Sequence, residues 1–339
     1  MDENRAQSSV PILRIALFFV VVGVLLWVLS DIVLLLFAAI LLAVFFRNAA
    51  KVLARLTHLP VNLALAIVVL IMAAGVVGFA VQFGPRFVSE GQQLIKEVYD
   101  YLQYLRRNYG QTEWGRIITN IVSAGGASNF APVAPKLLTA TFGTVGALVL
   151  LIVTGLYLAI SPGLYINGSV HLLPLPYRPR GFEILMALGK VLLYWMLGQL
   201  IDMTVVGVLS TIGLFLLHVP LALALGVLAG FLTFIPYLGA ILAGIPAAIV
   251  ASSVSPATIL WVILLYFGCH TIEGYLVAPL VARRTVNLPP AITLLSITAF
   301  AELYGIFGAL IAAPLTAAVI VLVREVYVRD LLGDNPPYI

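Results

Sequence analysis

The chain has few charged residues and a single cysteine. Of its 339 residues, 62% are hydrophobic and 9% are charged, and the mean hydropathy is +1.12. A soluble domain carries about 25% charge, so this shortage excludes an ordinary soluble domain and predicts an all-α polytopic membrane protein. The lone Cys269 excludes an intrachain disulfide and any cysteine-based metal cluster.

The usual motifs of nucleotide-driven or covalent chemistry are also absent. No phosphate-binding loop and no Ser/His/Asp or Cys/His arrangement occurs. The sequence therefore predicts no enzyme, no metal site and no cofactor other than a coupling proton or monovalent cation. An intramembrane enzyme with Glu273 and His270 as acid and base is the alternative. The expected partners are the lipid bilayer and a small-molecule or ion substrate.

The net charge of +4 does not indicate nucleic acid, because the basic residues stand in the short gaps between apolar runs. Such placement is typical of an orientation signal in a membrane protein. A bilayer core of about 30 Å needs about 20 helical residues, so the runs predict about six spanning helices. These runs are 11–30, 32–46, 61–83, 141–160, 187–217 and 257–281.

Three regions follow from this pattern. Residues 1–83 are predicted to form an N-terminal membrane hairpin and a third span, with a short second run at 32–46. Residues 84–140 are polar but carry apolar positions at helical spacing, which predicts short amphipathic helices on the outer side. Residues 141–339 are predicted to form the core transport region.

Two stretches of this core region, 219–251 and 288–321, resemble each other. At an offset of 69 residues six positions are identical, among them Gly239 with Gly308. Each stretch is interrupted by glycine and proline, and a continuous helix of that length would measure about 50 Å, too long for one comfortable span. They predict two broken re-entrant helical hairpins that form an inverted repeat. The alternative is that the two stretches resemble each other only because both are apolar and rich in glycine and proline.

The charges give a topology. Six of the 18 lysines and arginines lie in 84–140, where charge orients weakly. If the N-terminus is cytoplasmic and both broken units are re-entrant, the other twelve share the cytoplasmic side, together with the C-terminus. Since one span separates the units, they would then enter from opposite faces, as in alternating-access carriers.

Few ionisable side chains are expected at membrane depth, where a charge costs about 2.5–3.5 kcal/mol on insertion scales. The candidates for a substrate or ion pathway are Glu273, Glu302, Asp202, Gln199 and His270. A spacing of three places Gln199 with Asp202, and His270 with Glu273, on common helix faces. The alternative role for these side chains is hydrogen bonding to the loose backbone ends of broken helices.

Glycine and proline are expected to open the helices within the two units. Proline removes a backbone donor, and glycine adopts conformations that other residues resist. The residues assigned to the breaks are Pro236, Gly239, Gly305, Gly308 and Pro314. Freed backbone groups at such breaks can bind ions or anionic groups, although kinks that serve packing alone are the alternative.

The chain resembles the autoinducer-2 exporter (AI-2E) family of bacterial permeases over nearly its whole length. The resemblance is most specific in 185–325, and it is carried by Gly198–Gln199, Ile235–Pro236–Tyr237–Leu238–Gly239, Pro246, Glu273, Pro279 and Gly305–Ala313–Pro314. It implies a secondary carrier of the bacterial inner membrane that forms a homo-oligomer. Relatives in this family are associated with export of a signalling molecule or with exchange of sodium or lithium for protons.

One position departs from the family pattern. Ala301–Glu302 stands before the last Gly-x-x-Gly, where the family is usually rich in glycine. An additional carboxylate at the second break would alter the substrate or the coupling ion. The sequence therefore favours a secondary exporter of a small polar metabolite, with a Na⁺(Li⁺)/H⁺ antiporter and a non-transporting membrane scaffold as alternatives.

Overall fold

The computed structural model describes residues 28–109, 141–236, 238–277 and 289–334. Every regular element in these residues is helical, which confirms the predicted all-α polytopic fold. In order, the elements are α2 (Ser30–Thr57), α3 (Val61–Tyr109), α7 (Thr141–Ile160), α8 (Pro162–His171), η1 (Leu175–Tyr177), α9 (Arg178–Leu216), α10 (Ala222–Leu232), α11 (Leu238–Ser252), α12 (Pro256–Ile272), η2 (Glu273–Val277), α14 (Pro290–Leu322) and η3 (Val323–Leu331).

Several of these helices are suited to a bilayer. Within the described ranges five are long and apolar enough to span a membrane, or six if the bent pair α7–α8 counts as one span. The bend of 84° in that pair falls at Ser161. The run at 141–160 matches α7, whereas the predicted run at 11–30 lies mostly outside the described residues.

Helix α2 extends far beyond the predicted run 32–46. It continues through the basic gap to Thr57 and ends at His58, whose positive φ of 57° closes the helix. Arg47, Lys51 and Arg55 stand four residues apart, so they lie on one face and do not interrupt the helix. The apolar run 32–46 therefore marks only part of this helix, which also includes most of the basic gap.

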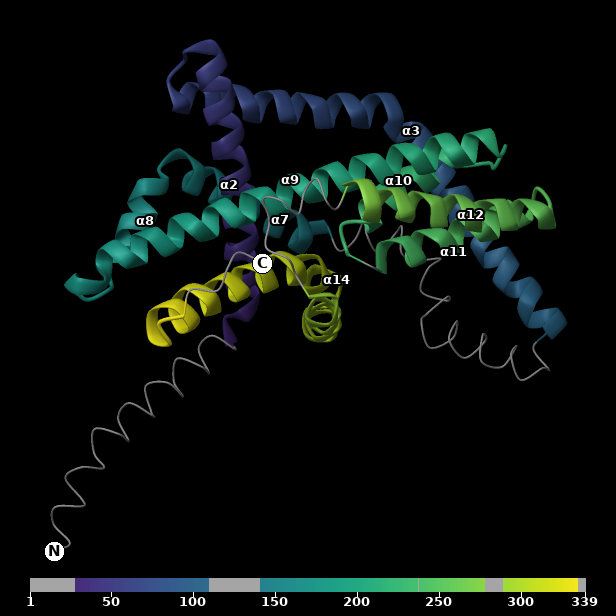
Figure 1. Cartoon of the computed structure of the whole chain (residues 1–339). Helices are drawn as coiled ribbons and strands as arrows, with labels where there is room; N and C mark the ends of the chain where they lie inside the picture. Colours follow the sequence, from purple (N-terminus) through teal and green to yellow (C-terminus); the bar gives the residue numbers. More distant parts are fainter. Residues whose placement is uncertain (1–27, 110–140, 237, 278–288, 335–339) are drawn as a thin grey trace, which may run out of the picture.

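The prediction of short separate helices in 84–140 is wrong for its first part. Helix α3 continues through Pro85 to Tyr109 as one element of 49 residues. Figure 1 shows α3 changing direction along its course. Residues 110–140 lie outside the described residues. We refer to residues 86–109 as the α3 arm.

Two packed groups of helices form the core. Helices α2, α3 and α7 pack around a cluster that includes Phe46, Leu65 and Ala159. Helices α9 to α12 pack around a second cluster that includes Leu214 and Leu225, both fully buried. Figure 1 shows α9 as a long helix across the molecule. Helix α8 folds back along the first part of α9, and α10 lies beside its second part.

Candidate functional site

The first broken unit is a helical hairpin. Helices α10 and α11 pack against each other, and Thr233–Pro236 between them is not helical. Pro236 lies in this break, and Gly239 follows in the first turn of α11. A Cβ at Gly239 would collide with the carbonyl of Leu232, so only glycine lets the chain return this closely on the end of α10.

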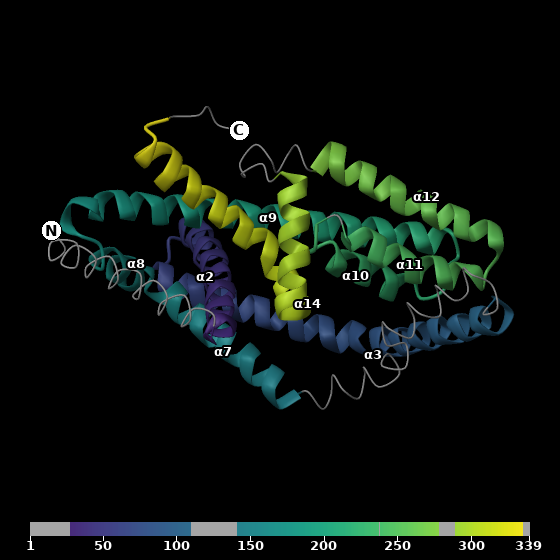
Figure 2. The ribbon, with the colours of Figure 1, turned by 90° about the horizontal axis from the view of Figure 1, so that it is seen from below.

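The second broken unit has its interruption at one residue. Gly305, with φ 62° and ψ −150°, divides α14 into two helical limbs, which meet in a V in Figure 2. This backbone region is accessible essentially only to glycine. Gly308 and Pro314 lie within the regular second limb, so the expectation that they open the helix is wrong. Gly308 instead packs where a Cβ would collide with the carbonyl of Phe300.

The first break packs on the two limbs of the second broken unit. Ile235 of the first break shares one buried cluster with Ile297, Ala309 and Ala312 of α14, and Leu238 and Phe300 pack against it. Ile235 comes from the turn of the first hairpin. Ile297 lies on the first limb of the second hairpin, and Ala309 and Ala312 lie on its second limb. The geometry therefore brings together the two segments that resemble each other in sequence.

Gln199, which lies on the neighbouring helix α9, makes a hydrogen bond to the first break. Its side-chain Nε2 donates to the carbonyl oxygen of Thr233 at 2.8 Å, and both residues are buried. Thr233 is the residue that caps α10 at the break. A buried carbonyl without a donor is costly, so Gln199 performs the backbone-satisfying role that the sequence left as an alternative.

Loss of this bond should destabilise the protein. We expect Gln199→Leu to lower the free energy of unfolding by about 1–3 kcal/mol, the cost of a buried polar group without a partner. The control is Thr204→Val, because the Thr204 hydroxyl bonds back to Leu200 of its own helix and to no other residue that the structure describes. Thermal unfolding in detergent measures both variants, and equal midpoints would contradict the role given to Gln199.

The acidic candidates Asp202 and Glu273 approach each other across the α9–α12 packing. Glu273 opens η2, a short π-helical turn at the end of α12, and such turns are frequent at functional sites. Asp202, three residues after Gln199 on α9, lies close enough to interact electrostatically with Glu273. The α9 face thus connects the first break with the Glu273 carboxylate.

His270 is the third member of this group. Its Nδ1 lies 2.8 Å from Oε2 of Glu273, and the two side chains are 37% and 23% exposed. This is an ion-pair distance if the imidazole is protonated. The two atoms are not aligned for a hydrogen bond, and both Glu273 Oε2 and Asp202 Oδ1 are buried atoms without a hydrogen-bond partner among the described residues.

Glu302 lies apart from this group. It stands on the first limb of α14, three residues before Gly305, and its side chain is exposed. It makes no hydrogen bond or ion pair with any other residue that the structure describes. Across all the residues that the structure describes, no three His, Cys, Asp or Glu side chains converge in a way that could hold a metal ion.

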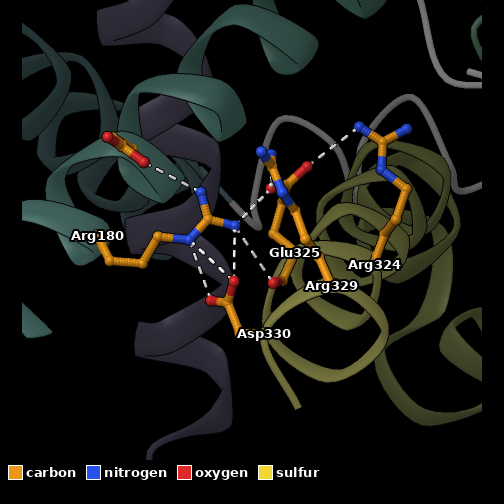
Figure 3. Close-up of polar contacts among 6 residues, drawn as sticks. Arg180, Arg324, Glu325, Arg329 and Asp330 are labelled. Carbon is orange, nitrogen blue, oxygen red and sulfur yellow. Dashed lines mark hydrogen bonds and ion pairs between the residues drawn. The ribbon is translucent and has the colours of Figure 1, made fainter. Parts of the chain in front are cut away.

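An ion-pair cluster joins α9 to η3, the π-helical segment that follows α14, and the sequence analysis counted only its arginines, as topology markers. Figure 3 shows the Arg180 guanidinium between carboxylates from two elements. It lies 2.8 Å from Glu325, 3.0 Å from Asp330 and 3.1 Å from Glu183. Arg324 and Arg329 also contact Glu325, whose side chain is 11% exposed. The cluster fixes the second broken unit against α9.

Reversal of one charge should break this cluster. We expect Arg180→Glu to lower the free energy of unfolding by about 2–3 kcal/mol, since a largely buried Glu325 loses its nearest cation. The neutral double variant Arg180→Gln with Glu325→Gln should lose less than the sum of the losses in its two single variants. Lys190→Gln, which removes an exposed charge of α9, is the control. Additive losses in the double variant, measured by thermal unfolding, would contradict a direct pair.

Long apolar helices, with two interrupted helical units packed among them, define a multi-pass membrane protein. The model of the AI-2E family transporter matches residues 16–328. The chain therefore belongs to this family, in agreement with the resemblance of its motifs, and a role in membrane transport follows.

Curated relatives agree with this assignment. The "Putative transport protein YueF" of Bacillus subtilis is 27% identical over 278 residues, which is 77% of this chain and 75% of that protein. A "Putative transport protein" of Thermotoga maritima is 27% identical over 69% of this chain and 72% of its own length. The "Putative transport protein YrrI" of B. subtilis is 30% identical, but the match spans only 45% of this chain and 43% of that protein.

Proposed function

We propose that this protein is a secondary transporter that exports a small polar metabolite or signalling molecule, similar to autoinducer-2, by alternating access around the two broken hairpins. The observation that carries the proposal is the buried cluster that the first break shares with both limbs of the second hairpin. Secondary transporters bind substrates and coupling ions where discontinuous helices meet near the bilayer midplane. Here Gln199 and Asp202 on α9 extend that junction toward Glu273.

The proposed setting is the inner membrane of a bacterium, with both termini in the cytoplasm and the protein in a homo-oligomer. The two hairpins would enter from opposite faces as an inverted pair. The distribution of lysine and arginine supports this orientation.

Coupling to an ion is part of the proposal. Asp202 and Glu273 each have a buried carboxylate oxygen without a hydrogen-bond partner among the described residues, and only that of Glu273 has a cation-forming neighbour, His270 at 2.8 Å. An ionised carboxylate in apolar surroundings is costly unless it is paired. A proton or a monovalent cation shared by this pair would remove that cost. The same observation favours the second candidate, a Na⁺(Li⁺)/H⁺ antiporter.

Two flux assays on the purified protein in proteoliposomes separate the candidates. One follows efflux of autoinducer-2 from loaded vesicles, and the other follows internal pH with a dye when Na⁺ or Li⁺ is added. Solute efflux without cation-evoked proton flux supports the exporter. Cation-evoked proton flux without solute efflux supports the antiporter, and neither flux from correctly assembled protein would leave a scaffold role.

A further inference from the structure

The α3 arm contacts the first broken hairpin at a point that no sequence motif indicated. Oε2 of Glu90 accepts a hydrogen bond from the backbone N–H of Ala224 at 3.0 Å, although the two residues are 134 positions apart. Leu94, one turn further along the arm, packs against the buried cluster of α9 to α12. Two residues on one face of the arm therefore hold the same hairpin.

The hydrogen bond of Glu90 completes the start of α10. The first turn of any helix leaves backbone N–H groups without partners, and a side chain at the N-cap usually satisfies one of them. The N-cap of α10 is Leu221, which has a positive φ of 60° and makes no side-chain cap. Ala224 is buried, so the carboxylate of Glu90 replaces the missing cap and complements the positive end of the helix.

Helix α3 also belongs to the other packed group. Near its start, Ala64 and Leu65 lie in the buried cluster of α2, α3 and α7. The arm is the continuation of that same helix, so α3 is a direct connection between the N-terminal helices and the hairpin that forms the first break. Glu90 makes a polar contact between the two ends of this connection, the arm and the hairpin.

We propose that Glu90 is a positioning residue for transport, and that through it the α3 arm and the first broken hairpin move as one body. This inference rests on the proposed transport function. It differs from a purely stabilising cap, because it requires the contact between Glu90 and Ala224 to persist through the transport cycle. If the hairpin moved past the arm, the contact would have to break in every cycle.

The first test compares Glu90→Ala with Glu90→Gln, and uses Gln92→Ala as the control because Gln92 is exposed on the same arm. We expect Glu90→Ala to lower the maximal flux about tenfold, the factor that corresponds to loss of one charge-assisted hydrogen bond, without a change in KM. Glu90→Gln keeps an acceptor oxygen and should recover part of the rate. Hydrogen exchange should rise at the start of α10 in Glu90→Ala and stay unchanged in Gln92→Ala.

The second test replaces the hydrogen bond with a covalent link. In a Cys269→Ala background, Glu90→Cys with Ala224→Cys should transport slowly until a short bifunctional thiol reagent joins the two positions, and the link should then restore flux. A linked protein that remains slow or stops would overturn the proposal, as would normal flux in Glu90→Ala. Absence of flux in the wild-type protein would instead overturn the transport function itself, and this inference with it.

Discussion

Glu273→Gln is expected to reduce flux to the level of protein-free liposomes while the protein still assembles normally. The substitution keeps the size of the side chain and removes its ability to exchange a proton or bind a cation. Glu273 lies 2.8 Å from His270 and within electrostatic reach of Asp202, at the end of a spanning helix. An ionisable side chain in such a position is seldom retained without a polar role.

Glu302→Gln is the matched comparison for Glu273→Gln. It removes a carboxylate of the same length from the second broken unit, but Glu302 is exposed and separate from the His270 group. We expect a change in apparent affinity or ion preference and not a loss of flux. Full flux of Glu273→Gln, in an assay that detects flux of the wild-type protein, would contradict the role assigned to Glu273. Loss of flux in Glu302→Gln alone would place the essential carboxylate at the second break instead.

The second large effect is expected at the paired glycines of the two breaks. Gly239→Ala and Gly308→Ala each place a Cβ against a backbone carbonyl, of Leu232 and of Phe300 respectively. Backbone cannot move aside as a flexible side chain does, so each substitution should cost about 1–3 kcal/mol of folding free energy or more. Flux should fall in both variants, because the geometry of each break changes.

Gly78→Ala on α3 is the control for both glycines, since a Cβ there would meet nothing within 4 Å. Alanine favours a helix over glycine by about 1 kcal/mol, so this variant should be as stable as the wild type or more stable. Thermal unfolding and flux are measured together. Equal behaviour of Gly239→Ala, Gly308→Ala and Gly78→Ala would contradict the close return of the chain at the breaks.

Much of the architecture could be predicted because its signals are local. Apolar runs fix the spanning helices, and α7 begins and ends where the run 141–160 does. The two breaks fall within the paired segments because Pro236 lacks a donor and Gly305 takes a backbone conformation closed to other residues. The function of the candidate site residues stays a prediction.

The errors arise where local signals compete with packing. The predicted run 32–46 stops before Arg47, but α2 continues to Thr57 because one helical face can carry Arg47, Lys51 and Arg55. The predicted run 61–83 also stops early, because the loss of one backbone donor at Pro85 does not end α3. Glu90 and Arg180 were missed as contacts because their partners, Ala224 and Glu325, lie more than a hundred residues away. No spacing rule connects such pairs.

The central claim is that transport takes place where the two broken hairpins meet. The most direct measurement joins them reversibly, with Ile235→Cys and Ala309→Cys in a Cys269→Ala background whose flux is measured first. Both positions lie in the cluster that the first break shares with the limbs of α14. A reducible bifunctional thiol reagent should stop flux, and reduction should restore it. Flux at the unlinked rate in fully linked protein would contradict the claim.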